Sequence, residues 1–228
     1  MKKLSILFLF VIPFLGFSQE FWSKKLSEFS TISIQGRMQV VLASGDEYKV
    51  EANIHGDNVD IDKLVFIYKD SKLSVRYQGG AFADVDLILT FYLPKSVDIE
   101  VKEGVELRMK DGYVLKKDKL MITAFAGGKI AATVASEKVT AEIHQGGSIR
   151  LSGSTTDLDC HVFTGGTIAT ISLKAKNVTA SVAMGGEIIT TAEDNLDAKV
   201  TSGGTISYKG EPKKKTEKIT LGGKIEKL

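Results

Sequence analysis

Two of the three histidines lie near carboxylates with which they could share a metal ion. Glu142 and His161 are 19 residues apart, which is the period of the repeat described below, and Asp159 lies two residues before His161. If successive coils stack as strands do, Glu142 and His161 occupy equivalent positions about 4.8 Å apart. One imidazole and two carboxylates can bind a transition metal. The other interpretation, which we favour, is a solvated Glu–His pair, so the sequence predicts no metal and no cofactor.

Carboxylates are the second possible source of chemistry, because parallel β-helices can carry polysaccharide lyases and hydrolases. Such sites need clustered carboxylates, or a carboxylate with an Arg or Lys base, on one strand face. Equivalent outward positions of successive coils form columns along the solenoid. One column includes Met121 and Asp159, and another runs from Thr123 to Lys218. In both columns each acidic residue stands alone, without a second carboxylate at the same level. No nucleophile motif, phosphate-binding loop or dinucleotide fingerprint is present. We therefore predict no catalytic residues and keep a polysaccharide-active enzyme only as the second alternative.

A third outward column contains aromatic side chains. It reads Phe125, His144 and Phe163, again at 19-residue intervals. Exposed aromatic residues in a row are expected where a protein stacks on a sugar or contacts another protein. We predict that these three residues form a ligand or partner face. The alternative is that the N-terminal half of the chain, or a second copy of it, covers them.

These columns follow from a repeat in which two glycines, any residue and an isoleucine occur six times. The first glycines are separated by 19, 19, 20, 18 and 19 residues. The copies are Gly127-Gly128-Lys129-Ile130, Gly146-Gly147-Ser148-Ile149, Gly165-Gly166-Thr167-Ile168, Gly185-Gly186-Glu187-Ile188, Gly203-Gly204-Thr205-Ile206 and Gly222-Gly223-Lys224-Ile225. Glycine adopts positive φ and lets backbones approach closely, so each pair predicts a corner. The isoleucines predict a ladder of like side chains in the interior.

Apolar residues alternate before each glycine pair, which is typical of a strand with one buried face. Val139, Ala141 and Ile143 show the alternation in one copy. A second short strand begins after the glycines, and a polar corner of variable length follows it. We therefore predict an all-β, parallel β-solenoid, for which right-handed winding is favoured, with about 19 residues and two or three short strands per coil.

The N-terminus predicts export. Residues 2 and 3 are lysines, residues 4–17 are almost entirely apolar, and Gly16 and Ser18 are small residues of the kind that precede a cleavage site. We predict a signal peptide over residues 1–18 and no membrane-spanning segment in the mature chain. Its removal leaves 28 basic and 28 acidic residues. A neutral chain has no general field for nucleic acid, so no such partner is expected.

The ends of the repeat are less regular. Residues 19–118 lack the Gly-Gly-x-Ile motif, since Gly79-Gly80 is not followed by an isoleucine at the same spacing, but we interpret them as β structure that is continuous with the solenoid of residues 119–228. The long interval between Gly104 and Gly127 leaves the number of coils open there. In the degenerate last coil, Lys213 to Lys215 predict a cap that discourages end-to-end stacking. An anion-binding or envelope-binding patch is the alternative.

Several segments resemble the family called "putative auto-transporter adhesin, head GIN domain". These segments are Phe29 to Gly36, Val40-Val41-Leu42, Leu89 to Pro94 and the Gly-Gly repeat. The resemblance covers residues 29 to 225. It implies a bacterial cell-envelope protein with a fold like a parallel β-helix, and it brings no catalytic residues to this chain.

From these observations we predict an exported, adhesin-like binding module that recognises a glycan or a protein partner. It would lie in the periplasm, on the outer-membrane surface or outside the cell. The first alternative is a structural or self-assembling envelope protein, which includes a homo-oligomer.

Overall fold

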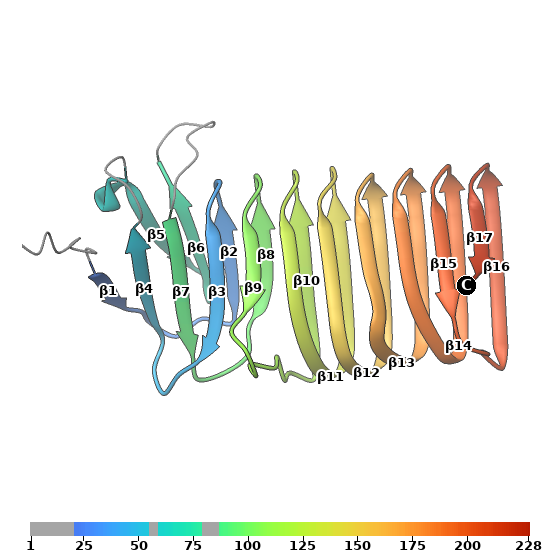
Figure 1. Ribbon diagram of the computed structural model, residues 1–228, viewed down its shortest axis with the longest axis horizontal. Helices are drawn as coiled ribbons and strands as arrows, with labels where there is room; N and C mark the ends of the chain where they lie inside the picture. Colours follow the sequence, from blue (N-terminus) through green and yellow to red (C-terminus); the bar gives the residue numbers. More distant parts are fainter. Residues whose placement is uncertain (1–20, 55–58, 79–86) are drawn as a thin grey trace, which may run out of the picture.

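The computed structural model describes residues 21–54, 59–78 and 87–228. The predicted signal peptide lies outside these ranges. The described residues form one 17-stranded sheet, wound into a β-solenoid of about 7 turns (Figure 1). The predicted all-β solenoid with coils of about 19 residues is confirmed.

Each regular coil is one long, bent strand that runs from one glycine pair to the next. These strands are β11 (Lys129–His144), β12 (Ser148–Thr164), β13 (Thr167–Met184) and β14 (Glu187–Ser202). For these four coils the prediction of two or three short strands was wrong, because pairing continues through the polar corner, where Ser154 lies beside Ala135 and Lys174. The pairing of β12 with β13 is irregular between Arg150 and Ser152, just before that corner, and such β-bulges accommodate the variation in coil length.

The interior is built from columns of identical or similar apolar side chains. Ile149 pairs with Ile130 on one side and Ile168 on the other, and the same register continues through Ile188 and Ile206. All five are buried, so the predicted isoleucine ladder is confirmed. Ile225, the sixth, pairs with Ile206 but is only partly buried because no coil follows it.

The two glycines of each pair serve different purposes. Gly146 has φ +79°, and a Cβ added there would meet no atom within 4 Å, so only its backbone conformation favours glycine. Gly147 has φ +116°, and a Cβ there would lie 2.5 Å from the carbonyl oxygen of Gly128. That oxygen accepts a hydrogen bond of 3.0 Å from the backbone N–H of Ser148. The second glycine thus allows neighbouring coils to pack at the corner.

The N-terminal half extends the same parallel ladders without the Gly-Gly-x-Ile motif. Strand β8 (Asp98–Lys102) pairs with β10 (Lys119–Phe125), and β9 (Glu106–Met109) pairs with β11. On their other side, β8 pairs with β2 (Thr31–Gln35) and β9 with β3 (Gln39–Ser44).

Antiparallel strands close the N-terminal end. Strand β7 (Leu87–Leu93) pairs in parallel with β3 and antiparallel with β4 (Lys49–Ile54), which also pairs with β1 (Phe21–Lys25). A turn of 3₁₀ helix, η1 (Ile61–Lys63), precedes β5 (Leu64–Lys69). Strands β5 and β6 (Lys72–Tyr77) form an antiparallel hairpin. These strands lie opposite the C-terminus along the solenoid (Figure 1).

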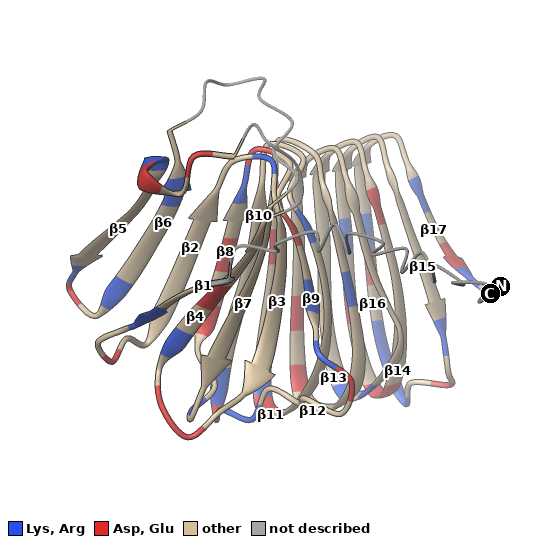
Figure 2. Ribbon diagram, turned by 60° about the vertical axis from the view of Figure 1, so that its left-hand side comes forward, with Lys and Arg blue, Asp and Glu red and all other residues tan. Residues whose placement is uncertain are grey.

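The C-terminal end is an open coil made of β15 (Thr205–Lys209), β16 (Lys214–Leu221) and β17 (Lys224–Lys227). Every residue of β16 is exposed. Where the preceding coil has Leu196 and Ala198, β16 has Lys215 and Glu217, which form an ion pair of 3.1 Å. Elsewhere, acidic and basic residues are interspersed over the strands (Figure 2).

Candidate functional site

The register of the parallel strands brings the three predicted site residues together. Phe125, at the end of β10, lies beside His144, at the end of β11. The register of β11 and β12, in which Ile143 pairs with Val162, places His144 beside Phe163 in the same way. Because side chains alternate along a strand, residues flanked by buried neighbours such as Val162 point outward.

The three rings form one stack along the solenoid axis, which we call the aromatic column (Phe125, His144 and Phe163). The centroids of Phe125 and His144 are 4.6 Å apart with planes inclined by 11°. Those of His144 and Phe163 are 4.3 Å apart with planes inclined by 12°. The rings therefore present edges, not faces, to solvent along most of the column.

The two ends of the column differ. At Phe125, the ammonium of Lys102 from β8 lies 5.1 Å from the ring centroid, within the range of a cation–π contact. At Phe163, the register of β12 and β13 places Ala183 in the next coil. A methyl group cannot cover a phenyl ring, and Phe163 is 41% exposed. The column thus offers one ring face for stacking, the face of Phe163 that is directed toward Ala183.

Polar groups lie beside the aromatic column, and an exposed apolar side chain lies in the next coil. Glu142 Oε2 lies 3.3 Å from His144 Nε2, which fixes the imidazole within the stack. His161 Nδ1 lies 2.7 Å from Ser181 Oγ, and its ring is tilted against Phe163 with centroids 6.4 Å apart. Met184 is 59% exposed near the end of the same strand as Ala183. An apolar ring face beside hydrogen-bonding groups suits an amphipathic ligand such as a sugar.

Glu142 and His161 do not form the pair considered from the sequence. They lie side by side in register, as expected, but Glu142 contacts His144 and His161 contacts Ser181. Asp159 forms an ion pair of 2.6 Å with Lys138. Within the described ranges, no three residues among His, Cys, Asp and Glu are placed to hold a metal ion.

Sequence reasoning missed the contribution of β8. Lys102 covers Phe125 and also forms an ion pair of 2.7 Å with Glu100. Burial opposes ionisation of Glu100, but hydrogen bonds from Lys102, Lys72 and Ser33 outweigh it and lower the pKa of Glu100 from 4.5 to about 2. Val97, Ile99 and Val101 alternate with polar residues, as in a strand with one buried face, but this segment has no glycine pair from which its register with β10 could be predicted.

Fold and site together define a parallel β-solenoid with a half-buried aromatic column that is exposed at Phe163. The chain belongs to the family described as "Putative auto-transporter adhesin, head GIN domain", whose model matches residues 28–212. The resemblance noted in the sequence is thereby confirmed.

Solved structures of low sequence identity share the fold. A putative adhesin from Bacteroides fragilis has a TM-score of 0.81 and 19% identity, over 93% of this chain and 98% of that one. A putative lipid binding protein from Parabacteroides distasonis has a TM-score of 0.70 and 19% identity, with the same coverage of 93% and 98%. A putative adhesin from Parabacteroides merdae has a TM-score of 0.65 and 18% identity, over 93% and 97%.

No curated protein matches the chain. In the part of the chain that the structure describes, no helix has the length and apolar character needed to cross a membrane.

Proposed function

We propose that this protein is an exported binding module of the bacterial cell envelope that recognises a glycan or a protein partner at the Phe163 end of the aromatic column. The observation that carries the proposal is the uncovered face of Phe163. A sugar ring places its C–H face on an aromatic face and its hydroxyls on neighbouring polar groups. His161 and Ser181 lie beside Phe163 and can supply such hydrogen bonds.

The family and two of the structural neighbours support this class of function, because they are named as adhesins. The carboxylates near the column support binding over catalysis, since Glu142 contacts His144 and Asp159 is neutralised by Lys138. Phe163 is not buried by the N-terminal half, which supports its use as a contact surface.

The test is a glycan array probed with the chain from residue 19 to 228 and with two variants of the column. Phe163→Ala removes the uncovered face, so binding is expected to be lost. Phe125→Ala is the matched control, because both faces of that ring are already covered by Lys102 and His144. It should retain most of the binding, and circular dichroism should show both variants folded.

If both variants lose glycan binding equally, the column contributes only to the stability of the fold. If both retain glycan binding equally, the ligand binds elsewhere. If the wild-type chain binds no glycan, glycan recognition is rejected. The protein-partner form of the proposal then predicts that Phe163→Ala, but not Phe125→Ala, abolishes binding of the purified protein to whole cells.

A further inference from the structure

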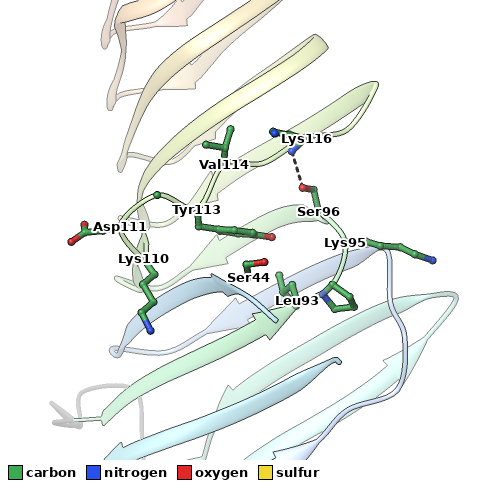
Figure 3. Close-up of a pocket in the computed structure, with 11 residues that line it drawn as sticks. Ser44, Leu93, Lys95, Ser96, Lys110, Asp111, Tyr113, Val114 and Lys116 are labelled. Carbon is green, nitrogen blue, oxygen red and sulfur yellow. Dashed lines mark hydrogen bonds between the residues drawn. The ribbon is translucent and has the colours of Figure 1, made fainter. Parts of the chain in front are cut away.

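A pocket of about 890 Å³ lies where the coil length is irregular (Figure 3). The long interval between Gly104 and Gly127 contains a loop, residues 110–118, that joins β9 to β10. This loop faces the turn between β7 and β8, which contains Pro94 and Ser96, and the two segments line the pocket, which is open to solvent, together with the end of β3. Insertions into a solenoid coil form loops on one face, and such loops are often used for binding.

The loop is held in place, so the pocket exists before any ligand arrives. Leu115 is fully buried and forms a bridge with Val134 of the next coil. Its backbone N–H donates to Thr133 O at 2.9 Å, and its carbonyl accepts from Ala135 N at 2.9 Å. The N–H of Lys116 donates to Ser96 Oγ at 2.7 Å. Pre-formed sites avoid the cost of ordering a loop when they bind.

Tyr113 has a buried hydroxyl without a hydrogen-bond partner among the described residues. In Figure 3 the ring lies above Ser44 and Leu93, with its hydroxyl end toward Ser96. Burial raises the pKa of Tyr113. Protein atoms cover the hydroxyl, so the ring, and not the hydroxyl, is the part of Tyr113 that a ligand in the pocket can contact.

The charge around the pocket is mainly positive. Its lining includes Lys95, Lys110 and Lys116, against one acidic residue, Asp111. Lys95 is neutralised by Glu28 at 2.9 Å. Within the described ranges, Lys110 and Lys116 form no ion pair with a carboxylate; Lys110 lies 5.9 Å from the ring centroid of Tyr92. Two lysines are thus available for an anionic group.

We propose that this pocket binds an acidic saccharide. The Tyr113 ring with Leu93 and Pro94 suits the C–H face of a sugar, the exposed hydroxyl of Ser44 suits its oxygens, and the two lysines without an ion pair suit its carboxylate. The volume is within the usual range for small-ligand sites. The site is separate from the aromatic column, because the loop precedes β10 and Phe125 ends that strand.

The experiment is isothermal titration calorimetry of the chain with trigalacturonate as the probe, and with galactotriose as its neutral counterpart. Trigalacturonate is expected to bind and galactotriose to bind at least about tenfold more weakly, because it lacks the charge-assisted contacts. Tyr113→Leu, which removes the ring, and the double variant Lys110→Gln, Lys116→Gln should each weaken trigalacturonate binding by about tenfold. The matched control Lys174→Gln, Lys199→Gln should not, because these lysines lie on distant coils.

Phe163→Ala should bind trigalacturonate normally, which separates this site from the proposed column site. Tyr113→Phe keeps the ring and removes only the covered hydroxyl, so it should fold and bind trigalacturonate normally, which shows whether Tyr113→Leu acts through the ring. The proposal is overturned if trigalacturonate does not bind, if galactotriose binds equally, or if Tyr113→Leu and the lysine double variant bind like the control. Binding only to phosphatidylglycerol vesicles would also overturn it and assign the lysines to a lipid headgroup.

Discussion

The imidazole of His144 and the ring of Phe163 lie face to face, with centroids 4.3 Å apart, although 19 residues separate them in the chain. This separation is close to the spacing of adjacent strands, about 4.8 Å. The period of the coil therefore creates the stack, and the rings should contribute to stability as a unit.

A double-mutant cycle on His144 and Phe163 tests that coupling. His144→Ala and Phe163→Leu should show an interaction energy of about 0.5–1.5 kcal/mol in urea unfolding, because stacked aromatic pairs contribute that much beyond their burial. His144→Ala combined with Thr179→Ala, on a different column, should be additive. An interaction energy of zero for His144 and Phe163 would show that the two rings are in contact but do not stabilise the fold as a pair.

The glycine corner predicts that substitutions of its two glycines lower the free energy of unfolding by unequal amounts. Gly146→Ala should cost about 1–2 kcal/mol, because alanine must adopt a left-handed conformation. Gly147→Ala should cost at least about twice as much, because its Cβ would also meet Gly128 O at 2.5 Å and force the coils apart. Chemical denaturation of both variants checks the order, and equal costs would contradict the close-packing explanation.

The cluster around Glu100 predicts acid sensitivity. Its folded pKa of about 2 lies below the ordinary value of 4.5, so the carboxylate stabilises the fold above that ordinary value. The contribution is lost as the pH falls from about 4.5 toward 2. Glu100→Gln should cost about 1–3 kcal/mol at neutral pH and reduce the pH dependence in that window. The measurement is the free energy of unfolding of the wild type and of Glu100→Gln at several pH values. If the two pH profiles are parallel, Glu100 is not the cause of the acid sensitivity.

Cys160 predicts a thiol that is inert in the folded protein. It is fully buried in the interior of the solenoid, and burial raises its pKa to about 12. A disulfide reagent near pH 8 should therefore label it only after denaturation, since the thiolate is the reactive form. Thr179→Cys, at an exposed position, is the positive control. Labelling of native Cys160 as fast as that control would show that the coils open readily.

The last coil predicts a barrier to self-association. Lys215→Val with Glu217→Ala restores apolar residues at the open end, where the preceding coil has Leu196 and Ala198. The variant should form larger species with rising concentration in sedimentation velocity, while the wild type and Lys174→Val stay monomeric, because charged residues at an open edge prevent stacking. A monomeric variant would favour the alternative that these lysines bind anions.

The repeat made much of the fold predictable. Ile149 and Ile168 could be placed in one buried ladder because equal spacing in a solenoid puts equivalent residues on top of one another. The continuous strands through Gly153 could not be predicted, because polar residues such as Ser154 are typical of loops. Pairing with both neighbouring coils overrides that local preference.

The columns are encoded in the residue spacing, since a constant period converts residue number directly into position along the axis. The alignment of Phe125, His144 and Phe163 could therefore be predicted from the sequence. The faces of these rings that stay open depend on the folded chain, because Lys102 comes from a strand outside the repeat. The pocket at Tyr113 also becomes visible only in three dimensions, because segments without a period meet through side-chain packing and loop closure, which residue spacing does not encode.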